Sequence, residues 1–168
     1  MKKMMMITLS LALILTAQIV FADPVQLFDY ALYKVTTEHK NLPTDVYTVA
    51  STLTSYDSVK KSYTREIDVE VLAGIEQGQS SKNQETYSAV EMPNGGDFAS
   101  VAKDCVISNG TPANITAMNT SFNACLYDAG GKTWMANVPF GLVKSVTSDS
   151  STGEVTTKEL IEFRFGAP

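Results

Sequence analysis

The side chains that could do chemistry are few and widely spaced. The chain contains one histidine, His39, and two cysteines, Cys105 and Cys125. A Ser-His-acid triad would need a nucleophile and an acid placed beside His39, and no Gly-x-Ser-x-Gly motif is present. Zinc sites use clusters of Cys and His at short spacing, which these three residues do not form. We therefore expect no metal and no cofactor, and we interpret His39 as a solvated loop residue.

The best set of carboxylates is Glu66, Asp68 and Glu70. Their spacing places all three on one face of a strand, where a calcium ion could be held. Glycoside hydrolysis needs only two carboxylates, so a carboxylate-based hydrolase stays an alternative. The alternation itself demands polar residues on a solvent-facing side. We interpret the three as a solvated acidic face and expect that the protein is not an enzyme.

The two cysteines are an isolated pair. Redox chemistry would need Cys-x-x-Cys or a thiolate beside a base, and neither is visible. In an oxidising compartment such a pair usually forms one disulfide. We predict a Cys105–Cys125 disulfide that stabilises the fold by about 3 kcal/mol, with two free thiols as the alternative.

The N-terminus has the pattern of a secretory signal peptide. Lys2 and Lys3 precede an apolar stretch, and Val20 and Ala22 occupy the small-residue positions of a cleavage site. A transmembrane helix is the alternative, but the run is near the lower length limit for spanning a bilayer. We predict cleavage after Ala22, in residues 1–22, and location in the periplasm or outside the cell. After cleavage the chain is not expected to be an integral membrane protein.

The processed chain, residues 23–168, is acidic and has the length of a single domain. Removing Lys2 and Lys3 from the 13 basic residues leaves 11 against 18 acidic ones, a net charge of −7. With no cluster of Lys and Arg, this chain is a poor partner for nucleic acid, and anionic membrane surfaces would repel it.

Period-two alternation dominates this domain and predicts strands. In residues 62–72, Tyr63, Arg65, Ile67, Val69 and Val71 alternate with polar residues, and the Arg65 stem is expected to lie on apolar surface with its head in solvent. In the last strand, the alternation predicts one face that carries Val155, Thr157, Ile161, Phe163 and Phe165. The strands are expected over residues 27–38, 45–57, 62–72, 83–90, two within 113–128, 132–138, 142–149 and 154–165.

Short links between these strands require antiparallel pairing. One long interruption, residues 92–112, contains the only short helix that we predict, over residues 97–104. The expected fold is mainly β, a curved antiparallel sheet of about eight or nine strands, half-barrel or barrel-like, with one short helix.

A family resemblance rests on the C-terminal motifs. Trp134, followed by VPFGLVK (138–144) and ELIEF (159–163), resembles the C-terminal hairpins of exported bacterial proteins of unknown function. Those proteins look like distant relatives of the periplasmic lipoprotein-carrier fold, in which a half-barrel wraps an acyl chain. TSFNAC (120–125) occupies the place of the short strand that precedes the tryptophan in the family pattern. The resemblance covers residues 115–163 and brings no catalytic residues with it.

These observations favour a non-catalytic binding module that holds an apolar small molecule, a lipid or a lipidated partner on the concave side of its sheet. We interpret Trp134 either as a core residue or as a residue at the mouth of an apolar cavity. The alternative is a structural or adhesive domain that contacts another envelope protein through an exposed edge strand. The predicted ligand-binding residues are Tyr30, Leu32, Ile67, Val69, Trp134, Met135 and Phe163.

Overall fold

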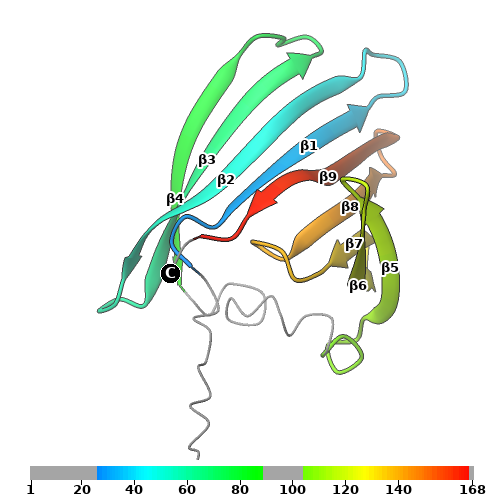
Figure 1. The fold of residues 1–168 in the computed structure, drawn as a ribbon. Coiled ribbons are helices and arrows are strands. Elements are labelled where there is room, and N and C mark those ends of the chain that lie inside the picture. The colour runs from blue at the N-terminus through cyan, green and yellow to red at the C-terminus, as the bar shows by residue number, and fades with distance from the viewer. Residues whose placement is uncertain (1–25, 89–103, 167–168) are drawn as a thin grey trace, which may run out of the picture.

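The computed structural model describes residues 26–88 and 104–166, which form one antiparallel sheet of nine strands (Figure 1). The predicted signal peptide, and the predicted helix apart from Asp104, lie outside these residues. The strands are β1 (Tyr30–Glu38), β2 (Asp45–Asp57), β3 (Ser62–Ala73), β4 (Ser80–Ser88), β5 (Thr111–Ala117), β6 (Thr120–Asp128), β7 (Gly131–Met135), β8 (Leu142–Asp149) and β9 (Glu154–Arg164).

The strand order is β4-β3-β2-β1-β9-β8-β7-β6-β5. Apart from β4 and β5, consecutive strands therefore pair as antiparallel hairpins, and the β1–β9 pairing joins the two ends of the described chain. The outermost strands, β4 and β5, do not pair with each other, so the sheet is not closed into a barrel. The prediction of a mainly β, antiparallel fold is confirmed.

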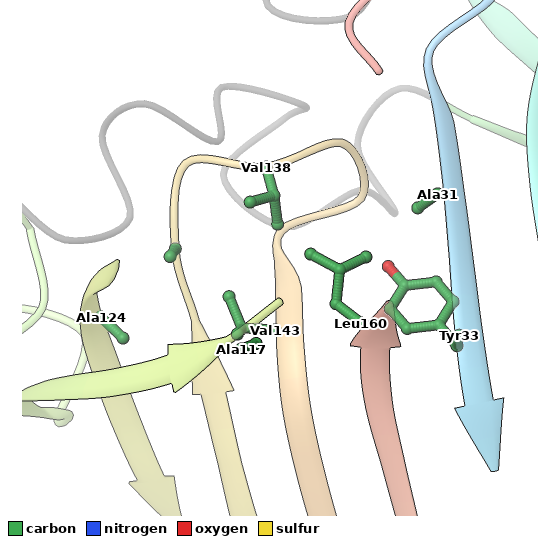
Figure 2. Close-up of a cluster of buried hydrophobic side chains, with 8 residues drawn as sticks. Ala31, Tyr33, Ala117, Ala124, Val138, Val143 and Leu160 are labelled. Carbon is green, nitrogen blue, oxygen red and sulfur yellow. The ribbon is translucent and has the colours of Figure 1, made fainter. Parts of the chain in front are cut away.

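The sheet curls around one face, which we call the concave face. Side chains from β1, β5, β6, β8 and β9 meet in one buried cluster, although β5 lies four strands from β9 in the sheet (Figure 2). Strands this far apart bring side chains together only when the sheet bends toward them. The concave face is therefore the one that carries Ala31, Tyr33, Val143 and Leu160.

The register carries this face outward to β2 and β3. Tyr33 pairs with Val49, and Val49 pairs with Val69. Because successive side chains of a strand point to opposite faces, Ile67, Val69 and Val71 share the concave face, as the sequence predicts. The acidic residues that alternate with them, Glu66, Asp68 and Glu70, point to the other side, which we call the convex face.

The last strand corrects one expectation. Leu32 pairs with Glu162 and Tyr33 with Leu160, so Ile161 is an extra residue in a β-bulge. The bulge shifts the alternation: Leu160 is fully buried, whereas Ile161 is 42% exposed. The predicted face that joins Ile161 to Phe163 is therefore wrong, and Phe163 shares its face with Leu160.

The predicted disulfide is confirmed. Cys105 and Cys125 are bonded, with their Cα atoms 5.3 Å apart, and Tyr127 and Met135 pack against the buried pair. The bond ties the segment before β5 to the middle of β6. Because disulfides persist in oxidising compartments, it indicates an extracytoplasmic protein. No helix of residues 26–88 and 104–166 is long and apolar enough to cross a membrane.

Candidate ligand-binding face

An apolar band on the concave face is only half-buried. Its members are the alternating side chains of β2 and β3 at the end of the sheet near the β3–β4 turn: Tyr47, Val49, Ile67, Val69 and Val71. Part of this band lines a groove of about 410 Å³, together with Asp45, Ile75 and Glu76. Half-buried apolar surface in a groove is the usual lining of a site for apolar ligands.

The β7–β8 loop bounds the band at its other end. The sequence predicts that the chain leaves the sheet near Pro139, and β7 ends at Met135. Val138 and Pro139 are fully buried, and the Phe140 ring packs against Leu53 and Tyr63 on the concave face. Phe140 adopts a left-handed backbone (φ 61°), which is unfavourable for a bulky residue. The packing of its ring compensates for this strain.

The Arg65 side chain lies between two aromatic rings, one of them from this loop, and is 28% exposed. Its guanidinium carbon lies 5.4 Å from the Tyr87 ring centroid and 5.7 Å from that of Phe140. Its Nη2 donates to Glu85 Oε2 at 2.6 Å, while its Nε is buried without a hydrogen-bond partner. The concave face therefore holds a cation that is only partly compensated.

A second cation lies further along the same face. The Lys158 ammonium lies 4.4 Å from the centroid of the Tyr33 ring, and no ion pair or hydrogen bond joins it to a described residue. Burial lowers the pKa of Lys158, and the Arg65 charge lowers it further. The Tyr33 hydroxyl is also buried without a partner, and burial raises the pKa of this phenol above its ordinary value.

His39 is not a solvated residue, which overturns a second expectation. Its Nδ1 lies 2.8 Å from Glu154 Oε1 and its Nε2 lies 3.0 Å from Asp45 Oδ2. Its side chain is only 15% exposed. His39 therefore connects the end of β1 to the starts of β2 and β9, and its contacts suit a structural role.

The acidic set lies on the convex face. Lys82, on β4, pairs with Glu66 at 2.5 Å and with Asp68 at 3.7 Å. Within the described ranges, no three His, Cys, Asp or Glu side chains are grouped so that they could hold a metal ion. Two of these carboxylates, Glu66 and Asp68, are thus paired with a lysine.

The structure brings together only part of the predicted ligand-binding set. Ile67 and Val69 belong to the apolar band, and Phe163 lies on the concave face opposite Ala31. Tyr30 and Leu32 lie on the convex face, because they alternate with Ala31 and Tyr33.

Trp134 and Met135 are neighbours in β7, so their side chains point to opposite faces of the sheet. Trp134 packs against the buried cluster that contains Ala124 and Val143. Met135 packs against the disulfide. The prediction that these seven residues bind a ligand remains a prediction.

Sequence reasoning missed Tyr33, Lys158 and the position of the Arg65 head. Lys158 precedes Leu160 by two residues, and side chains two residues apart in a strand share a face. If Leu160 had been assigned to the apolar face of β9, Lys158 would have been assigned to it too. The bulge at Ile161 hid that phase. No local signal in the sequence marks an unpaired hydroxyl such as that of Tyr33.

Similar solved structures include a LolA superfamily protein from Nitrosomonas europaea, with 10% identity, a TM-score of 0.30, and coverage of 85% of this chain and 88% of that one. MucB matches with 7% identity and a TM-score of 0.43, and covers 87% of this chain and 56% of its own. A chain of the Pseudomonas aeruginosa MucA/MucB complex matches with 7% identity, a TM-score of 0.44, and coverage of 82% and 52%.

The chain spans about half the length of the MucB chains that it matches. No protein-family model matches the sequence, and a search of curated proteins finds no match. Because the TM-scores are below 0.5, the function proposed below rests on the geometry of this chain.

Proposed function

We propose that this protein is an exported, non-catalytic binding module that holds an apolar ligand or a lipidated partner on its concave face. It acts in the periplasm or outside the cell, after removal of residues 1–22. The apolar band of Tyr47, Val49, Ile67, Val69 and Val71 is the observation that carries this proposal. Burial of apolar area would supply the affinity, at about 25 cal/mol per Å² removed from water before the costs of binding.

A pair of adjacent residues tests this assignment. Val71 lines the concave groove, whereas Leu72, the extra residue of a β-bulge, is 42% exposed and does not line it. Val71→Asp should reduce the affinity for a fluorescent fatty acid at least tenfold, because a carboxylate in the groove opposes binding of an apolar chain. Leu72→Asp should leave it within about twofold. Equal losses in both variants, or no uptake by the unmodified protein, would contradict the proposal.

A second candidate function rests on β4, whose outer edge has no strand partner among the described residues. Seven of its nine residues, from Ser80 to Thr86, are exposed. Such an edge can accept a strand from a partner protein. If this is the function, Gln84→Pro, at a position whose backbone amide points to the free outer edge, should prevent capture of the envelope partner while Val71→Asp should not.

A carboxylate-based hydrolase is disfavoured by the contacts of the acids. The buried carboxyl of Asp29 accepts hydrogen bonds from the Gly166 and Gln26 amides, at 2.8 and 3.1 Å. Burial raises the pKa of Asp29, but its hydrogen bonds tie together the two ends of the described chain.

A further inference from the structure

The apolar-ligand function leaves Lys158 and Tyr33 of the concave face unexplained. Burying a charged or hydroxyl group without a partner opposes folding. Neither group has a hydrogen-bond partner within the described residues, and the two lie side by side, with the ammonium 4.4 Å from the ring centroid. Figure 2 shows Tyr33 beside Leu160 in the cluster.

The charge of this region opposes that of the whole molecule. The full chain carries a net charge of −5, yet Arg65 and Lys158 are near enough that the charge of the arginine lowers the lysine pKa. Glu85 is the acid paired with Arg65, and no acid among the described residues pairs with Lys158. Lys158 is therefore a cation of this face that has no acid partner among the described residues, and such a group suits an anion.

The register places these groups in line with the apolar band. Lys158 pairs with Val35, which pairs with Tyr47, which pairs with Val71. The neighbouring row runs from Leu160 through Tyr33 and Val49 to Val69. With neighbouring strands ~4.8 Å apart, Lys158 lies ~14 Å from Val71 across the sheet, a length suited to an acyl chain.

We infer that Lys158 and Tyr33, supported by Arg65, form the headgroup subsite for an anionic amphiphile whose acyl chain lies along the apolar band. The ammonium and the phenol would each donate a hydrogen bond to one oxyanion, either the carboxylate of a fatty acid or the phosphate of a phospholipid-type head. This inference rests on the proposed function and assigns the polarity of its ligand.

The test compares three amphiphiles with the same tail: dodecanoate, dodecyl phosphate and dodecanol. Each displaces a fluorescent fatty acid from the full processed chain. The unmodified protein should bind at least one of the two anions roughly tenfold more tightly than dodecanol, and Lys158→Met should abolish that preference. Tyr33→Phe, which removes only the hydroxyl, should weaken the preferred anion severalfold while the fold stays intact by circular dichroism.

Lys144→Met is the matched control, because the Lys144 ammonium pairs with Glu159 at 3.1 Å on the convex face. It should leave the preference unchanged. A preference for dodecanoate indicates a fatty acid, and one for dodecyl phosphate indicates a phosphate headgroup.

Equal affinity for all three amphiphiles, or an anion preference that survives both Lys158→Met and Tyr33→Phe, would overturn the headgroup subsite and leave the apolar function standing. Failure of every amphiphile to bind would overturn the proposed function itself.

Discussion

At the scale of single residues, His39 makes the clearest structural contacts of the described chain, with Glu154 and Asp45. It is the only histidine of the chain, and it joins strands whose contact residues, His39 and Glu154, are 115 positions apart. The hydrogen bond to Asp45 raises the pKa of His39, and the bond to Glu154 raises it further. Both carboxylates favour the protonated ring, so protonation should stabilise the fold.

This contact predicts a pH dependence of stability. Because the folded pKa of His39 lies above its unfolded value of about 6.5, the stabilisation is fully present below that pH and is lost as the pH rises through the folded pKa. The free energy of unfolding in urea should therefore fall with rising pH in this window. In His39→Gln the fall should disappear, and an identical pH profile in the variant would contradict the assignment.

At the scale of elements, the β9 bulge decides which side chains enter the core. Leu160→Ala should lower the free energy of unfolding by about 2–5 kcal/mol, because it opens a cavity in a fully buried cluster. Ile161→Ala, one position away, should cost less than about 1 kcal/mol because that side chain is largely outside the core. Urea unfolding of both variants measures the difference, and similar costs would contradict the bulge.

The bulge also shows where sequence reasoning reaches its limit. The bounds predicted for β2 and β8 match the structure, because turn residues flank both segments. In β9 the alternation is interrupted, and strict period two selects Ile161 instead of Leu160. β7 ends three residues early because the chain turns toward the concave face before Pro139.

At the scale of the whole molecule, alternation and short links were sufficient to predict an antiparallel sheet, and the isolated cysteine pair was sufficient to predict one disulfide. They could not predict which face is concave, because that depends on β5 meeting β8 and β9 far along the chain. The face assignment separates Tyr30 and Leu32 from Ile67 and Val69. It also brings Tyr33, Arg65 and Lys158 together from β1, β3 and β9, which no local pattern marks.

The central claim is that an acyl chain lies on the concave face of this sheet. Its most direct test is photo-crosslinking of the processed protein with a fatty acid that carries a diazirine in its tail, followed by mapping of the modified residues by mass spectrometry. We expect adducts at Tyr47, Val49, Val69 and Val71. Adducts confined to convex residues such as Thr48, Asp68 and Glu70, or none that excess dodecanoate suppresses, would contradict it.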